Sequence, residues 1–446
     1  MLKILVPDNL KHERSYAISA LINMIELDYS IEFEPLLKYY EIHYNDFKLV
    51  INDSFFIKFN NNLSYLSIEN IPQKVCWFNN TLPIIYGENY FIINEKEIYC
   101  GIDVFASAYF MLTRWEEYVV PNKDKFGRCN EDDMFVVKHG IYNRPIVDEY
   151  VELLKNLLTR IGVELPIPKN HFSVSLTHDV DYLFRYANFN NFIKNLAGDI
   201  LNRKSLPTFF STLYNYILFK FGKRLDPFDT FDEIMDLSES IGVRSAFYFK
   251  AAVKGEYDYT YNIFDKRVVA IMNNIVRRGH EVGIHPSKNT FRNPDHFRLE
   301  VERMRSIGFS VNGGRQHFLL YDLPYTLRTW SENGLLYDAG LGFAFRAGFR
   351  CGTSHEYNYF DFLKREVLPI KIRPLICMEG ALFDYQKERS MPDIEREIID
   401  LVDKVHRYNG CFVFLWHNDR FYRPESLKTV PIYRNVLTYL SRLQNE

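Results

Sequence analysis

The stretch HFSVSLTHDVD, residues 171–181, joins a strand-like pattern to three ionisable side chains. Apolar and polar residues alternate along its first part, which is typical of a half-buried β-strand. His178, Asp179 and Asp181 follow at its end. Directly before it, ELPIPKN (164–170) holds two prolines and is typical of a linker. A second domain is therefore expected to begin near residue 170, with a strand that ends in two carboxylates and an imidazole.

Strand and helix patterns alternate after this first strand. Helical spacing of apolar residues covers 226–242, 265–279, 293–308 and 396–410, and each segment ends in a glycine, a signal for a helix C-terminus. Strand-like runs occur at 243–250, 280–287 and 411–418, with shorter ones near 313 and 337. This alternation predicts the α/β class with a parallel sheet, and its repetition favours a (β/α) barrel over residues 170–446.

Residues 1–165 predict a smaller α/β domain in front of that barrel. MLKILV (1–6) is typical of a first strand, and ERSYAISALINMI (13–25) has the apolar spacing of a helix. VFASAYFMLTRWEEYVV (104–120) predicts one strong helix, and PIVDEYVELLKNLLTRIG (145–162) predicts another, with Pro145 in its first turn.

The ends of several predicted strands in the second domain carry polar residues. In a closed parallel barrel these ends share one face, where active sites are built. Carboxylates and histidines gathered there suggest a metal with a general base beside it, because such a metal lowers the pKa of water and polarises a carbonyl group. The residues in question are His178, Asp179, Asp181, His285, Ser287, Arg315, His317 and His417.

These strand ends also carry a resemblance to a known family. LTHDVD (176–181), GHEVGIHPS (279–287), GGRQHF (313–318), YDAGLGF (337–343) and FLWHN (414–418) resemble, in this order, the motifs of the polysaccharide deacetylases, the NodB-homology superfamily of carbohydrate esterases. YFMLTRWEEY (109–118) and KFGRCNEDD (125–133) resemble the N-terminal domain that precedes such deacetylases in bacterial surface-polysaccharide loci. The resemblance implies a distorted (β/α) barrel of the deacetylase type.

The resemblance also implies catalytic roles for individual residues. Asp179 matches the catalytic base, Arg315 the arginine that orients this base, and His417 the general acid. Asp338 matches a supporting residue of the fourth motif and is expected, with His178 and Ser287, on the substrate side of the site.

A divalent metal, zinc with cobalt or nickel as alternatives, is the implied cofactor. Val180 stands where the family usually has its metal aspartate, so Asp181 would take that role beside His285. The position of the second metal histidine is Asn289, and an amide oxygen is a weaker zinc ligand than imidazole. His317 or His178 would compensate, or the metal would be held more weakly.

The expected activity is hydrolysis of an N- or O-acetyl group on a bacterial glycan or its precursor. One alternative is a deacetylase fold that has lost catalysis and serves as a glycan-binding or scaffold protein in polysaccharide biosynthesis. A lesser alternative is a carboxylate-based glycoside hydrolase that uses Asp179 and Asp181. The sequence leaves open the sugar, the choice between amide and ester, and the oligomeric state.

Composition narrows the location and the partners. The net charge of −3 gives no reason to expect nucleic acid as a partner. The six scattered cysteines argue against a thiolate zinc site and a disulfide scaffold. The start resembles no signal peptide and no run is long enough to span a bilayer, so the cytoplasm, or the inner face of its membrane, is the expected location.

The segment 182–224 stands apart from the barrel pattern as an insertion. It holds seven Lys and Arg residues against one acid, and it is rich in Phe, Tyr and Leu. Three interpretations remain open at this point: a helical arm packed on the barrel, an oligomer contact, or a peripheral contact with a membrane.

Overall fold

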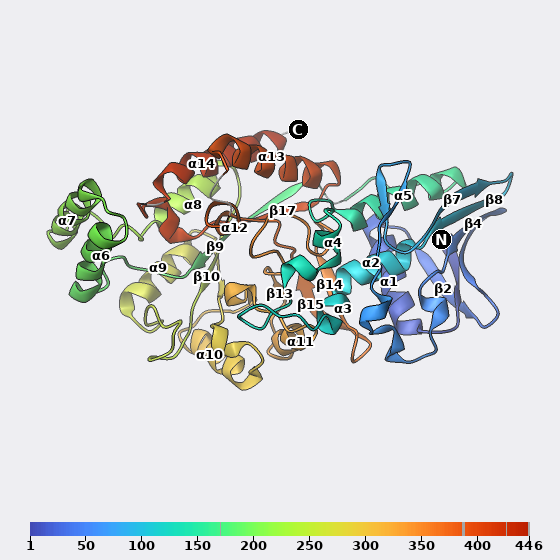
Figure 1. The fold of residues 1–446 in the computed structure, drawn as a ribbon, viewed down its shortest axis with the longest axis horizontal. Helices are drawn as coiled ribbons and strands as arrows, with labels where there is room; N and C mark the ends of the chain where they lie inside the picture. The colour runs from blue at the N-terminus through green and yellow to red at the C-terminus, as the bar shows by residue number, and fades with distance from the viewer. Residues whose placement is uncertain (170, 386–388, 425, 445–446) are drawn as a thin grey trace. The chain divides into compact units, whose positions relative to one another are not determined.

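A computed structural model describes residues 1–169, 171–385, 389–424 and 426–444. The chain divides into two compact units, each built from several stretches of sequence (Figure 1). Unit 1 comprises Met1–Ser173, Phe318–Ile376 and Leu401–Phe412, and unit 2 comprises Val174–His317, Cys377–Asp400 and Val413–Glu446. The predicted domain boundaries, 1–165 and 170–446, stay a prediction; residue 170 itself, at the end of the predicted linker, lies outside the described residues.

Unit 1 is built on a mixed six-stranded sheet with the order β2-β1-β3-β4-β8-β7. Helices α1 (Lys11–Ile25), α2 (Val104–Thr113) and α5 (Ile146–Arg160) pack against one another through their buried apolar faces. The strands are β1 (Leu2–Pro7), β2 (Tyr29–Glu34), β3 (Tyr39–Tyr44), β4 (Phe47–Asn52), β7 (Gly87–Ile93) and β8 (Glu97–Ile102). The later stretches add α11 (Tyr325–Glu332), β13 (Tyr337–Asp338), β14 (Tyr357–Asp361) and β15 (Glu366–Ile372).

The prediction of a single helix at 104–120 is wrong, because the structure has two helices there. The chain breaks at Arg114, which has a φ of +54°, and α3 (Trp115–Val119) then begins in a new direction. The Arg114 guanidinium is fully buried and pairs with Glu116 and Glu117. Because a buried cation must keep its charge partners, this pairing outweighs the helical propensity of the apolar run.

Unit 2 is built on parallel strands in the order β12-β11-β10-β9-β17-β16. The strands are β9 (Ser173–Val180), β10 (Ala246–Phe249), β11 (Glu281–Ile284), β12 (Gly313–Gly314), β16 (Cys377–Met378) and β17 (Cys411–Leu415). The main helices are α8 (Phe231–Ser240), α9 (Lys266–Arg277), α10 (Pro294–Ser306), α12 (Glu379–Phe383) and α14 (Val430–Leu443), together with the first part of α13 (Met391–Arg407), whose residues from Leu401 on are counted in unit 1. The predicted α/β class is confirmed, whereas closure into a barrel stays a prediction.

The insertion at 182–224 forms two helices, α6 (Phe189–Leu201) and α7 (Leu206–Lys220). In the sequence they come between β9 and α8. In the structure they pack against each other, at the left of the view in Figure 1. Each begins at a polar N-cap, Asn188 for α6 and Ser205 for α7, whose side chain accepts a hydrogen bond from the first turn.

Candidate active site

The register of the parallel strands aligns the functional positions of unit 2. Val180, Phe249, Ile284 and Gly314 lie in register as successive partners across β9, β10, β11 and β12. The next residue on each strand is therefore at the same edge of the sheet, where parallel strands of α/β proteins present their active sites. These next residues are Asp181, Lys250, His285 and Arg315.

A glycine is required where β12 meets β11. A Cβ atom built on Gly314 would lie 1.8 Å from the carbonyl oxygen of Ile284. Only the missing side chain lets the two backbones approach, and Arg315 N then donates a hydrogen bond to the same Ile284 oxygen at 3.1 Å. This contact sets Arg315 beside His285.

Asp179 and Arg315 form a buried ion pair at the edge of the sheet. Arg315 Nη1 donates to Asp179 Oδ1 at 2.8 Å, and Nη2 donates to Thr177 Oγ1 at 2.9 Å. Burial alone would raise the pKa of Asp179, but the charges of Arg315, His285 and His417 outweigh it and lower the pKa below its ordinary value. Asp179 is therefore an ionised carboxylate, and its second oxygen, Oδ2, lies 3.7 Å from His285 Nε2.

Asp181, His285 and His317 form the group best suited to hold a metal ion. One ligand atom from each lies within 4.8 Å of the other two. His285 Nε2 lies 3.5 Å and His317 Nε2 lies 3.4 Å from Asp181 Oδ1, too far for normal hydrogen bonds. Two imidazoles and a carboxylate are a typical donor set for zinc with an open coordination position.

The other ring nitrogen of each histidine is held by the protein. His285 Nδ1 lies 2.7 Å from the carbonyl oxygen of Arg315 and so must donate its proton there. His317 Nδ1 lies 3.0 Å from Asp258 Oδ1. Both contacts point the Nε2 lone pairs toward Asp181, which is how proteins prepare histidine ligands for a metal.

The donor set fits a metal on two further observations. The Nε2 atom of His285 is buried and makes no hydrogen bond, although such buried atoms are normally satisfied. Burial also lowers the pKa of His317, which favours the neutral imidazole that a metal requires. A metal ion bound between Asp181, His285 and His317 would give the His285 Nε2 atom a partner and would use the neutral imidazole of His317.

Lys250 brings a positive charge to the same place. Its Nζ lies 2.7 Å from Asp181 Oδ1, and the side chain is buried. Burial would lower the pKa of Lys250, but the Asp181 charge outweighs it and raises the pKa. Lys250 is thus a cationic partner of Asp181 with which a metal ion would have to share that carboxylate.

His417 and Glu379 form a second acid–base pair. His417 follows β17, and its Nδ1 lies 2.5 Å from Glu379 Oε1, while Nε2 lies 3.7 Å from Asp181 Oδ2. Burial would lower the pKa of His417, but the Glu379 carboxylate, with smaller contributions from Asp181 and Asp179, raises it to about 9. His417 is therefore protonated at neutral pH, with Nε2 facing the Asp181 side.

Not every predicted site residue joins this group. His178 lies on the opposite face of β9, where its ring nitrogens contact the Trp416 carbonyl oxygen and the Ser245 hydroxyl, and its roles as substrate contact or metal ligand stay predictions. The Ser287 hydroxyl donates to Glu300.

Two further predictions remain open. Asn289 is exposed on the short helix η5 (Lys288–Thr290), and its assignment as a weak metal ligand stays a prediction. Asp338 belongs to unit 1, where it accepts hydrogen bonds from the Tyr321 hydroxyl and the Gly340 amide, and its role near substrate stays a prediction.

Sequence reasoning missed Lys250, Asp258 and Glu379. Lys250 had a usable signal, because it ends the strand pattern at 243–250 just as His285 follows the next strand. Asp258 lies in an irregular loop and Glu379 begins the short helix α12, so neither position follows from a strand or helix period.

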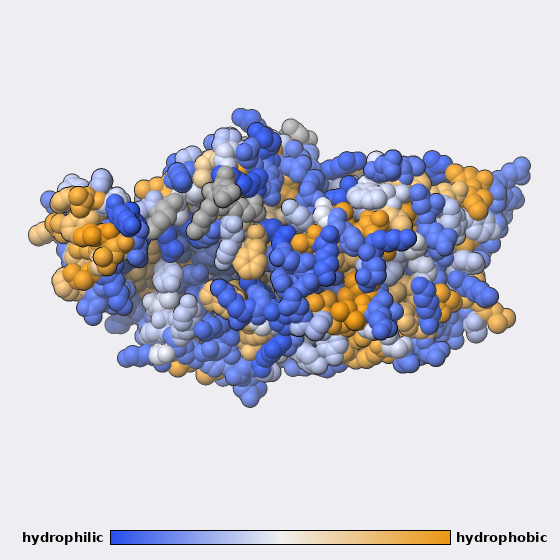
Figure 2. All heavy atoms as spheres, viewed as in Figure 1, coloured by the Kyte–Doolittle hydropathy of each residue, from blue (hydrophilic) through white to orange (hydrophobic). Residues whose placement is uncertain are grey.

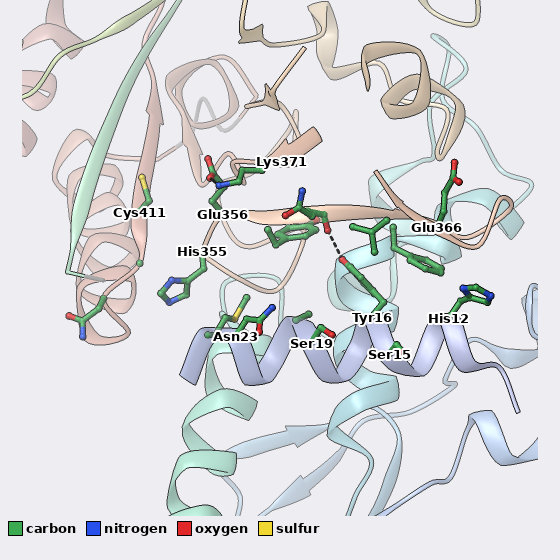
Figure 3. Close-up of a pocket in the computed structure, with 18 of the residues that line it drawn as sticks. His12, Ser15, Tyr16, Ser19, Asn23, His355, Glu356, Glu366, Lys371 and Cys411 are labelled. Carbon is green, nitrogen blue, oxygen red and sulfur yellow. Dashed lines mark hydrogen bonds and ion pairs between the residues drawn. The ribbon is translucent and has the colours of Figure 1, made fainter. Parts of the chain in front are cut away.

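Each unit also contains a cavity. In unit 2 a groove of about 530 Å³ is lined by Tyr182, Arg185, Lys194, Arg420 and Arg423, among others. In unit 1 a cavity of about 830 Å³ lies between α1 and the segment 355–371, with His12, Ser15, Ser19 and Asn23 of α1 on one side (Figure 3).

Comparisons with known proteins give the following matches. Residues 2–162 match the family described as "Family of unknown function (DUF7033)". Among curated proteins none matches the chain. Similar solved structures include a putative polysaccharide deacetylase from Mycobacterium smegmatis, with 16% identity, a TM-score of 0.39, and coverage of 63% of this chain and 86% of that one.

Two other solved structures show a likeness of the same order. The Puue allantoinase has 13% identity and a TM-score of 0.39, over 63% of this chain and 89% of its own. A probable polysaccharide deacetylase from Pseudomonas aeruginosa PAO1 has 13% identity and a TM-score of 0.37, over 64% of this chain and 90% of its own.

Proposed function

We propose that unit 2 is a metal-dependent hydrolase that removes an acetyl group from a carbohydrate. The observation that carries the proposal is the Asp181–His285–His317 group, with the ionised Asp179 and the protonated His417 beside it. The motifs around these residues, which resemble those of polysaccharide deacetylases, supply the substrate class.

The metal would be zinc, cobalt or nickel, held by Asp181, His285 and His317. It would supply a Lewis acid that polarises the acetyl carbonyl and acidifies water. Asp179 accepts the proton of the attacking water at Oδ2, because Arg315 occupies Oδ1 and keeps the carboxylate ionised and oriented.

His417 supplies the proton for the leaving nitrogen or oxygen. The Nδ1–H group of the His417 ring is held by the Glu379 carboxylate, so the proton that can be transferred is on Nε2. A carboxylate that is ionised and an imidazole that is protonated at the same pH are the two states that base and acid need at the start of the reaction.

A catalytically inactive binding protein is the second candidate, and Lys250 favours it. Its ammonium already balances the Asp181 charge without a metal. The glycoside hydrolase alternative is less favourable, because the pKa values of both Asp179 and Asp181 are lowered by neighbouring cations, after the opposing effect of burial. A glycosidase needs one of its two carboxyl groups protonated.

The test starts with metal content and then measures acetate. Full-length protein, purified without chelator, is analysed for bound metal and incubated with N-acetylated and O-acetylated oligosaccharides. The proposal predicts near-stoichiometric zinc, cobalt or nickel and metal-dependent release of acetate. Absence of bound metal after incubation with excess zinc would favour the binding protein, and release of reducing sugar without acetate would favour the glycosidase.

A further inference from the structure

We propose that helices α6 and α7 dock unit 2 on the surface of a membrane that contains anionic lipids. The inference does not depend on the proposed hydrolysis. None of the residues that carry it belongs to the candidate active site formed by Asp179, Asp181, His285, His317 and His417. It rests on the internal core of the two helices, on the apolar side chains they expose and on the charges around these.

The two helices complete their own core. Tyr186, Phe192 and Tyr216 are buried together, and Leu196, Leu213 and Phe219 pack against them. The rings of Phe192 and Tyr216 stack at a centroid distance of 3.6 Å. Apolar residues on the other faces of α6 and α7 are therefore not needed to hold the two helices to each other.

Helix α7 nevertheless exposes a continuous apolar stripe. Leu206, Phe210, Tyr214, Ile217 and Phe221 recur at helical spacing and share one face. Each is strongly exposed, from 44% for Ile217 to 75% for Phe221. A stripe of this size on one face usually marks a surface that is covered by something else.

Helix α6 adds to this apolar surface. Phe189, Ile193 and Ile200 fall on one helical face and are exposed, and Leu201 follows at 71% exposure. Figure 2 shows apolar side chains, in orange, gathered over these two helices at the left of the view, with hydrophilic side chains beside them. The two helices thus present two short amphipathic faces rather than one isolated patch.

Basic residues surround the apolar stripe. Lys204 precedes its first residue, and Lys220, Lys223 and Arg224 flank its last. Lys194 is exposed on α6. The only acid of 182–224, Asp199, is buried and pairs with Arg203, so it does not offset the exposed positive charge.

This combination fits a membrane surface better than a protein partner of neutral charge. Lys and Arg beside exposed Phe, Leu and Ile are typical of helices that lie in the interface of anionic bilayers. None of the described helices is long and apolar enough to cross a membrane. The expected mode is therefore shallow insertion of the α7 stripe, with the basic side chains on lipid headgroups.

Vesicle flotation of the full chain tests the proposal. Protein is mixed with vesicles of phosphatidylcholine and phosphatidylglycerol, or of phosphatidylcholine alone. We expect flotation with the anionic vesicles and a strong reduction with the neutral ones or at high salt. The double variants Phe210→Asn/Ile217→Asn and Lys194→Glu/Lys204→Glu are each expected to reduce binding at least about tenfold.

Matched controls separate the stripe from general surface effects. Val276→Asn/Leu299→Asn alters exposed apolar residues of α9 and α10, and Lys254→Glu/Lys266→Glu alters exposed lysines elsewhere in unit 2. Both are expected to float like the unchanged protein. Circular dichroism and thermal unfolding show whether each variant is folded.

Three results would overturn the proposal. The first is that the unchanged protein stays with the soluble fraction for both vesicles. The second is that the stripe variants float as well as the unchanged protein does. The third is a concentration-dependent dimer in sedimentation velocity that Phe210→Asn/Ile217→Asn abolishes, without flotation. That outcome would show that a second copy of the chain covers the stripe.

Discussion

The ammonium of Lys250 lies 2.7 Å from Asp181 Oδ1, the same oxygen that faces His285 and His317. A cation of the protein and a metal ion would therefore share one carboxylate. Coulomb repulsion between two such cations at close range is worth several kcal/mol even at an effective dielectric constant of about 20. Lys250 would thus set how tightly a metal is held at the proposed site, and its replacement would separate the two candidate functions.

Lys250→Met should tighten metal binding. Removal of the ammonium frees Asp181 and relieves its repulsion of the bound ion, so we expect the zinc dissociation constant to fall by about tenfold or more. Calorimetric titration of metal-free protein measures this, with Lys254→Met, an exposed lysine of the same unit, as control. Loss of folding without any gain in metal binding would show that Lys250 replaces the metal.

Asp258→Asn should weaken metal binding. The Asp258 carboxylate lies 3.0 Å from His317 Nδ1 and favours a proton on that nitrogen, which leaves Nε2 to face Asp181. Substitution of such a partner typically costs about 10- to 100-fold in metal affinity. Metal titration checks the value, and Asp236→Asn, an exposed partner of Arg278, is the control. Unchanged affinity would remove His317 from the ligand set.

Glu379→Gln should move the alkaline limit of activity. His417 must be protonated to act as general acid, and its pKa of about 9 predicts that activity falls as the pH rises through that value. Without the Glu379 charge the pKa falls toward the ordinary histidine value of about 6.5, so the alkaline limb shifts to lower pH. The pH profile of kcat/KM measures the shift, with Glu233→Gln as control.

The same pair affects stability in a defined pH window. Because folding raises the pKa of His417, its contribution to the free energy of unfolding is complete below about pH 6.5 and is lost as the pH rises through about 9. Glu379→Gln should remove this dependence from thermal unfolding curves. An unchanged profile would mean that Glu379 does not hold the charge on His417.

Asp179→Asn should abolish hydrolysis while it preserves metal binding. The amide cannot accept the proton of the attacking water, and loss of a general base costs about 10²- to 10⁴-fold in rate. The fold is also expected to lose about 3 kcal/mol of stability, because the buried Arg315 loses a charge partner. Acetate release, metal content and thermal unfolding are measured together; full activity in this variant would remove Asp179 from the base role.

The strand ends were the most predictable part of the site. Asp179, Asp181, His285 and Arg315 each follow a short apolar run, and parallel register brings such positions to one edge. The same strand period of two places the His178 side chain on the opposite face of β9 from Asp179, so its predicted role stays a prediction.

The partners that tune the site were not predictable from local pattern. Asp258 and Glu379 reach His317 and His417 across 59 and 38 positions of sequence, from a loop and from the start of a short helix. The break at Arg114 is similar, because a buried cation with two glutamates decides it and helical propensity does not. Buried charge pairs between residues that are far apart in the sequence produce no helical or strand periodicity by which they could be predicted.

The close packing at Gly314 links the positions of Arg315, His317 and His285 to one another. Its backbone packs against Ile284 with no room for a Cβ atom, and Arg315 and His317 follow within three residues, while His285 follows Ile284. Any side chain at this crossing would act as a wedge between two strands. It would separate Arg315 and His317, which follow β12, from His285, which follows β11, so one substitution would disturb the proposed base-orienting and metal-binding residues together.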